Sequence, residues 1–214
     1  MCWNKEVSLN TFLFSSFVLA LIVYNNYFTK YKIQELDNKW YIFFLASFIS
    51  IQLIEFFIWK NINNKFYNNI FSLAALSIFI IQPMISMMIM TNIPLRNVLL
   101  LLYALLAIPY SIYKLSTIHI HSAVSENGHL RWHFLEMSHF VWSVWLFFFL
   151  FSFVYEKKWF GLIFGLVTLI IAIINYKYGN TMGSMWCWSV NSIMIYYAAY
   201  LLIYLPFLER ASIC

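Results

Sequence analysis

All five histidines of the chain lie in one stretch, at His119, His121, His129, His133 and His139. If the segment HLRWHFLEMSHF (129–140) is helical, His129, His133 and Glu136 fall on one face, while Arg131 points away. Two imidazoles and a carboxylate at this spacing can surround one divalent metal ion, often zinc. The same residues also fit proton handling, or a solvated helix or loop at a membrane surface. The sequence leaves these three interpretations open.

Glu55, in IQLIEFFIW, is the only carboxylate that falls inside a predicted membrane span. Gln52, Glu55 and Trp59 share one helical face by their spacing. A carboxylate inside a bilayer costs ~2.5–3.5 kcal/mol near the centre, so it should face the bundle or a wet cavity. We expect either a glutamate that is hydrogen-bonded locally and to a neighbouring helix, or a functional proton or cation site.

The segment GSMWCWSVN (183–191) enters the last predicted span. Trp186 and Trp188 at a helix entrance are typical of the aromatic belt at a membrane interface, or they form the wall of a binding site. Cys187 and Asn191 share a helical face. Cys187 is expected on the same side as Cys2, where the two could pair, join a metal site or stay free thiols.

Two prolines interrupt apolar segments. IIQP places Gln82 and Pro83 inside one span, and Pro109 lies inside the next. A proline removes a backbone donor and kinks its helix, which makes room for polar partners. Such kinks occur in transporters and in inert bundles alike.

The elements that must position these residues are membrane helices. The chain has 63% hydrophobic and only 10% charged residues, against about 25% charged in soluble domains. Apolar runs long enough to cross a ~30 Å hydrocarbon core recur along it. We predict an all-α integral membrane protein, a single seven-transmembrane-helix domain over residues 1–214. The predicted spans are Val7–Tyr27, Trp40–Trp59, Asn69–Met90, Asn97–Leu115, His139–Tyr155, Trp159–Tyr176 and Ser184–Leu205.

Seven spans place the N-terminus and the second, fourth and sixth loops on one side of the membrane. This side, the N-terminal face, receives almost every chemically unusual residue, so a functional site should open there. The first loop carries Lys30, Lys32 and Lys39 against Lys5 at the N-terminus. The positive-inside rule then predicts an extracytoplasmic N-terminus. The basic residues are dispersed among the loops, which argues against nucleic acid as a partner.

Five segments in this order, MCWNKEVSLNTF, IQLIEFFIW, IIQP, NGHLRW and SMWCWSV, resemble an uncharacterised family of polytopic membrane proteins of giant and algal viruses, protists and algae. Members of that family begin with Met-Cys-Trp followed by Ser or Asn. The resemblance spans nearly the whole chain and implies a set of positions rather than a reaction. They are Cys2, Trp3, Gln52, Glu55, Trp59, Gln82, Pro83, His129, Trp132, Trp186 and Cys187. His119, His121 and His133 lie outside the pattern, which weakens the metal interpretation.

Two other seven-span families are less similar. The last span contains no lysine for a Schiff base, so a retinal protein is excluded. HLRWH is similar to a histidine pair of the alkaline ceramidases, which are zinc hydrolases. That family has the pair in its final helix, whereas here it lies mid-chain, and the sole aspartate, Asp37, is expected on the opposite side.

Three functions follow from these observations. We favour a channel, transporter or binding bundle for a proton, cation or small molecule, with Glu55 and Gln52 as its polar element and His129 as a pH-sensitive partner. This function requires no cofactor. A metal-dependent hydrolase acting on a lipid is the alternative, with zinc held by His129, His133 and Glu136. A structural membrane protein is the third. The bilayer is the expected partner, with a small ion or lipid as ligand, and the oligomeric state is undetermined.

Overall fold

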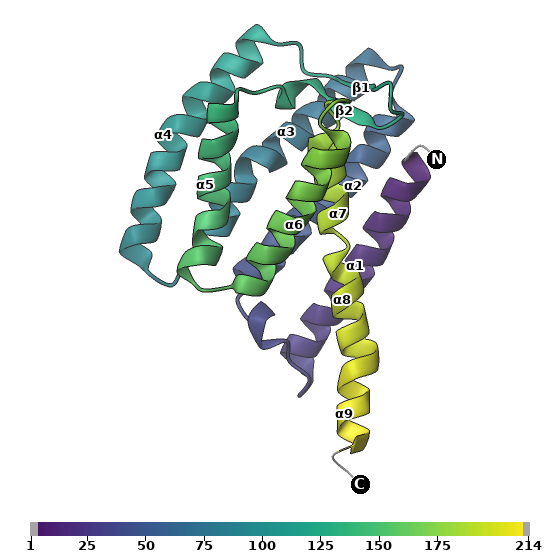
Figure 1. Ribbon diagram of the computed structural model, residues 1–214, viewed down its shortest axis with the longest axis vertical. Helices are drawn as coiled ribbons and strands as arrows, with labels where there is room; N and C mark the ends of the chain where they lie inside the picture. Colours follow the sequence, from purple (N-terminus) through teal and green to yellow (C-terminus); the bar gives the residue numbers. More distant parts are fainter. Residues whose placement is uncertain (1–3, 212–214) are drawn as a thin grey trace.

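The structure is a computed structural model that describes residues 4–211, and it is helical apart from one short hairpin (Figure 1). The long helices are α1 (Lys5–Phe28), α2 (Lys39–Lys60), α3 (Lys65–Met87), α4 (Ile93–Thr117), α5 (His139–Tyr155) and α6 (Trp159–Tyr176). The last helical segment comprises α7 (Met182–Val190), α8 (Ile193–Ala199), the π-helical turn η3 (Tyr200–Tyr204) and α9 (Leu205–Ala211). The short elements are the 3-10 turns η1 (Gln34–Leu36) and η2 (His133–Leu135) and the strands β1 (Ser122–Val124) and β2 (Leu130–Trp132).

Within residues 4–211, six helical segments are long and apolar enough to cross a membrane, namely α1, α2, α3, α4, α6 and the segment Met182–Leu208. The helical, multi-pass character of the chain therefore agrees with the prediction. The predicted count of seven spans is not confirmed, because α5 has only 17 residues. Its length of roughly 25 Å falls short of the ~30 Å hydrocarbon core.

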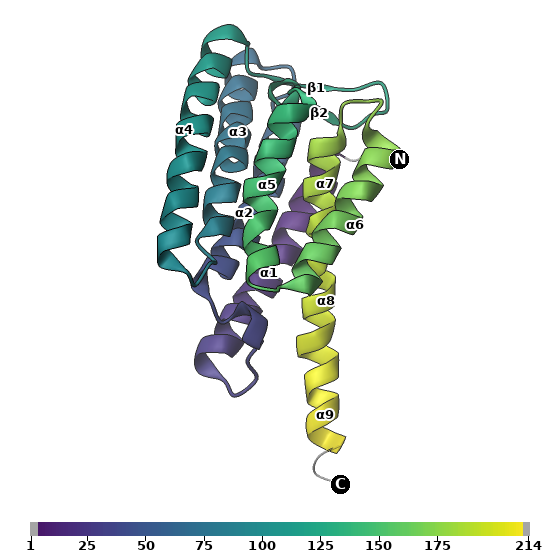
Figure 2. The same ribbon diagram turned by 60° about the vertical axis from the view of Figure 1, so that its left-hand side comes forward.

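Successive helices alternate in direction, as Figures 1 and 2 show. The start of α1, the hairpin and the α6–α7 turn therefore lie at the same end of the bundle. The C-terminal segment continues through α8 and α9 past the opposite end. The predicted N-terminal face thus gathers the loops that the alternating topology assigns to it.

Asparagine side chains begin four of the helices. Each accepts hydrogen bonds from first-turn backbone N–H groups, which have no partner inside the helix. These N-caps are Asn4, Asn38, Asn64 and Asn92. The abundance of asparagine in the polar loops therefore has a structural use.

Residues 118–138, here called the hairpin cap, contain an antiparallel hairpin, so the helical arrangement considered for 129–140 is not formed. Of the alternatives left open for this stretch, the loop is the one formed, and α5 begins at His139, the first residue of the predicted span. Gly128 has a φ of 78°, which glycine adopts without steric cost, and it closes the turn. The hairpin is fixed at both sides of the bundle. Asn68 exchanges two 2.9 Å hydrogen bonds with the backbone of Ser122, and Asn127 Nδ2 donates to Thr181 Oγ1 at 2.9 Å.

Aromatic rings fill the core between α2, α5 and α7. Trp186, only 1% exposed, contacts the rings of Phe48, Trp145 and Phe149 at centroid distances of 5.6 to 6.5 Å. Its indole N–H points at α6, 3.3 Å from Gly165 O and Thr168 Oγ1. The prediction of an interface belt is therefore wrong for Trp186, which packs inside the bundle.

Candidate functional site

Glu55 lies in the last third of α2, on the side facing α7, and is buried at 3% exposure. Gln52 Nε2 donates to Glu55 Oε2 at 3.1 Å, as their predicted shared face requires. The Ser184 hydroxyl of α7 donates a hydrogen bond to Glu55 Oε1. The carboxyl group is therefore held by one donor from its own helix and one from a neighbouring helix.

The α2–α7 contact continues as a line of polar side chains, here called the polar seam: Gln52, Glu55, Ser184, Cys187 and Asn191. Because the two helices run antiparallel, Ser184 meets Glu55 near the N-terminal face, while Asn191 meets Phe48 deeper in the bundle. Asn191 Nδ2 donates to Phe48 O at 3.2 Å and to Cys187 O at 2.9 Å. Cys187 is a buried free cysteine between these two contacts.

Two acceptor atoms of the polar seam, Gln52 Oε1 and Asn191 Oδ1, have no hydrogen-bond partner within residues 4–211. Gln52 is 0% exposed and Asn191 is 4% exposed. A buried acceptor without a donor costs about 1–3 kcal/mol. The seam therefore combines a carboxyl group with two amide oxygens that can accept a donor or contact a cation.

The hairpin cap closes the seam toward the N-terminal face. Gly183 precedes Ser184, and its Cα lies so close to Leu135 and Trp132 that an added Cβ would meet both side chains. Trp132 is 2% exposed and stacks on Phe134 at 5.5 Å. Access to Glu55 from this side therefore requires the cap and α7 to separate.

Gln82 and Pro83 are both buried, and the structure identifies the partners of this part of α3. Proline has no N–H for the carbonyl four residues earlier, so Phe79 O lacks its helical donor. Trp145 Nε1 of α5 donates to this oxygen at 3.0 Å, and its ring stacks on Phe79 at 4.2 Å. Gln82 Nε2 lies 3.4 Å from Ser47 Oγ of α2. The proline kink therefore serves helix packing at this position.

The predicted grouping of His129, His133 and Glu136 is not formed, because strand β2 separates the two histidines. His129 belongs to the hairpin cap and is buried, with its ring edge-on to Tyr176 at 5.1 Å. The hydrogen bonds to Glu55 come from Gln52 and Ser184. The structure therefore does not show His129 as a direct partner of Glu55 and Gln52.

His133 instead joins an ion cluster on the outside of the cap. Its Nδ1 lies 3.1 Å from Glu136 Oε1, and Arg131, predicted to point away, donates to the same oxygen at 2.6 Å. The His121 ring stacks on His133 at 4.2 Å. This cluster is partly solvated, as the exposed carboxylate of Glu136 shows.

Burial lowers the pKa of His129, and burial together with the His121 and Arg131 charges lowers the pKa of His133 despite Glu136 nearby. Burial raises the pKa of Glu136, but the hydrogen bond and charge of Arg131 outweigh it, so this pKa is lowered. Both imidazoles are therefore neutral and Glu136 is ionised at neutral pH. In residues 4–211, no three His, Cys, Asp or Glu side chains are arranged to hold a metal ion. Zinc binding stays a prediction without a geometric basis in this structure.

The remaining predicted positions are dispersed. Trp59 is half-buried at the end of α2, and Trp188 of α7 donates from Nε1 to Thr11 Oγ1 of α1 at 3.0 Å. Cys2 and Trp3 lie outside the described residues, so the structure does not test a pairing of Cys2 with Cys187.

Comparison of the chain with protein-family models, curated proteins and solved structures finds no match. The resemblance to the viral and protist family stays a prediction. The functional argument therefore depends on the chemistry of the site.

Sequence reasoning missed Ser184 as the partner of Glu55. It predicted Ser184 only as the first residue of the last span. A signal was present in the topology. The second and the last span run in opposite directions, so the start of the last span lies at the same depth as the end of α2. A hydroxyl there is a natural donor to a buried carboxyl group.

Proposed function

We propose that the chain is a seven-span membrane bundle that binds and passes a proton or a small monovalent cation at Glu55. In this proposal α5 crosses the membrane as a seventh, short span. Its polar capping residues, Ser138 and Glu156, lie at the two surfaces of a locally thinner bilayer. A short hydrophobic helix is accommodated by local thinning of the bilayer. The lysines of the first loop support an extracytoplasmic N-terminal face.

The observation that carries this proposal is the buried carboxyl group of Glu55 in the α2–α7 contact. An ionisable group inside a membrane span is costly and usually serves a pathway or a proton relay. A purely structural contact here could be made by apolar side chains at lower cost. Glu55 has instead two hydrogen-bond donors and two unpaired amide oxygens in the same seam.

The irregular seventh helical segment supports the same proposal. After Val190 the helix tightens to i→i+3 hydrogen bonds at Asn191 and Ser192, whose backbone stays in the right-handed helical region. It continues as α8 from Ile193 and then passes through the π-helical turn η3. Short 3-10 stretches inside a helix often mark hinges, and π-turns often occur at functional positions. This turn comprises Asn191 and Ser192, so α7 can move with Ser184 and Cys187 while α8 stays against α1.

In this proposal the structure represents an occluded state, in which Trp132 and Leu135 separate Glu55 from the N-terminal face. Passage then requires α7 to move relative to α2 and the cap. The zinc-hydrolase alternative has no support from the ligand geometry. A structural role fits the fold but gives no reason for the polar seam.

Reconstitution into liposomes tests the proposed function. Purified protein is inserted into vesicles that contain a pH-sensitive dye, and a potassium diffusion potential drives positive charge inward. We expect acidification of the lumen beyond that of protein-free vesicles if protons pass. Repeating the assay with sodium and a sodium-sensitive dye identifies a cation instead. Absence of both fluxes would contradict the proposal.

A further inference from the structure

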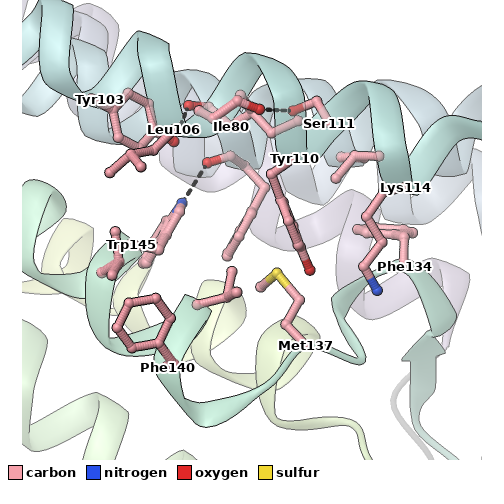
Figure 3. A pocket seen from close by; sticks show the side chains of 15 residues that line it. Ile80, Tyr103, Leu106, Tyr110, Ser111, Lys114, Phe134, Met137, Phe140 and Trp145 are labelled. Atoms are coloured by element: carbon pink, nitrogen blue, oxygen red, sulfur yellow. Dashed lines mark hydrogen bonds between the residues drawn. The ribbon is translucent and has the colours of Figure 1, made fainter.

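An apolar cavity of about 240 Å³ lies between α3, α4 and α5, away from the polar seam. Figure 3 shows its lining, with Ile80, Tyr103 and Leu106 toward one end and Lys114 and Phe134 toward the other. Leu106 is 54% exposed and Phe140 is 77% exposed, so the cavity reaches the outer surface of the bundle. In a membrane this surface is covered by lipid tails, which gives the cavity a lateral entrance.

The polar groups of the cavity gather at the end near the N-terminal face, where Tyr110, Ser111 and Lys114 lie (Figure 3). Lys114 is three residues before the end of α4, about 5 Å along the helix axis. This position corresponds to the headgroup layer of a bilayer. The rest of the lining is aliphatic or aromatic, so the cavity has one polar end and one apolar end.

Lys114 is a buried cation, 8% exposed, whose Nζ donates to the backbone oxygen of Glu136 at 2.8 Å. In residues 4–211 no carboxylate lies within ion-pair distance of it, because the Glu136 carboxylate is held by Arg131 and His133. An ammonium group has three donors, so two remain available. The Glu136 charge acts on Lys114 only from beyond ion-pair distance, and the centroid of the Tyr110 ring lies 5.9 Å from Nζ. Because a buried charge is costly unless it is closely paired, an anionic group at the cavity mouth would relieve this cost.

We propose that this cavity binds one acyl chain of an anionic bilayer phospholipid, whose phosphate lies at Lys114. The volume is below the ~300–1,000 Å³ that is typical of sites enclosing a whole drug-sized molecule. It therefore suits a single chain, while the headgroup stays at the membrane surface. The proposal is independent of ion passage at Glu55, because no residue of the polar seam lines this cavity.

Native mass spectrometry tests this site with defined vesicles. The protein is reconstituted in equal parts of phosphatidylglycerol and phosphatidylcholine with identical chains, extracted in mild detergent, and analysed for retained lipid. We expect one retained phosphatidylglycerol in preference to phosphatidylcholine. Lys114→Gln removes the charge and should reduce this retention at least tenfold, since the phosphate loses its hydrogen bond to a charged group. Lys177→Gln, at an exposed lysine of the same face, should leave it unchanged.

A second variant tests binding of the lipid's acyl chain rather than of its headgroup. Ala107→Phe places a ring in the cavity and leaves Lys114 in place, so retention of phosphatidylglycerol should be lost while gel filtration stays normal. Because Ala107 is independent of the Lys114–Glu136 contact, this variant decides the proposal even if Lys114→Gln does not fold. Equal retention of both lipids, or unchanged retention in either cavity variant, would overturn it.

Discussion

Replacement of Glu55 by glutamine is expected to reduce ion flux to the level of protein-free vesicles while the protein stays folded. Glutamine has nearly the same shape and keeps an oxygen that accepts from Ser184, but it has neither a titratable proton nor a charge. The measurement is the liposome flux assay, with gel filtration and circular dichroism as checks of folding.

Glu126→Gln is the matched control for this variant. It makes the same chemical change at an exposed carboxylate of the hairpin turn, on the same face of the bundle. Its flux should equal that of the wild type. Flux that persists in Glu55→Gln would show that the ion does not pass at this carboxyl group, and Glu55 would then be a structural hydrogen-bond acceptor.

Trp145→Phe is expected to have the largest effect on stability, with a loss of about 1–2 kcal/mol in the free energy of unfolding. The substitution keeps an aromatic ring but leaves Phe79 O without the donor that replaces the missing N–H of Pro83. Trp142→Phe is the control, because Trp142 also contacts the Phe79 ring and no hydrogen bond of its indole is seen in residues 4–211. Equilibrium unfolding in mixed detergent measures both variants.

A double-mutant cycle with Pro83→Ala isolates the cause. Alanine at position 83 restores a backbone N–H that can bond to Phe79 O, so Trp145→Phe should then cost markedly less. Equal costs in the two backgrounds would show that Trp145 contributes through ring packing alone. The cycle therefore separates the hydrogen bond from the stacking contact.

The spans were predictable because their length and apolarity are set by the bilayer. The predicted bounds of the second and sixth spans, Trp40–Trp59 and Trp159–Tyr176, differ from α2 and α6 by at most one residue. The turn at Asn191 and Ser192 was not predictable from hydropathy, since a similar polar pair, Ser15 and Ser16, lies inside the continuous helix α1. It depends on tertiary contacts of Asn191 with α2.

The hairpin cap was missed because the histidine spacing was interpreted with a helical period. The dipeptide Asn127-Gly128 is a strong hairpin signal, and Leu130 and Trp132 alternate with Arg131 as a half-buried strand requires. With this signal, the three proposed metal ligands would have been separated from the start. The turn-forming residues determine the structure of this segment, and the helical spacing of its histidines does not.

Glu55 was identified from the sequence because a carboxylate inside an apolar segment must have a partner. Lys114 was not, since a lysine near a span end is usually a solvated flanking charge. Its burial arises from the cap folding over the end of α4, where Glu136 O accepts from it. Long-range contacts of this kind are specified by the whole fold and not by local spacing.

The accessibility of Cys187 tests the central claim most directly, because this thiol lies in the polar seam and is buried in the occluded arrangement. With Cys2 and Cys214 replaced by serine, reconstituted protein is exposed to a small, membrane-impermeant, cationic thiol reagent while flux is recorded. If the seam opens to water, Cys187 should be modified slowly and flux should fall in proportion to the modified fraction. Flux that continues while Cys187 stays unmodified, over a time in which the unfolded chain reacts fully, would contradict a pathway between α2 and α7.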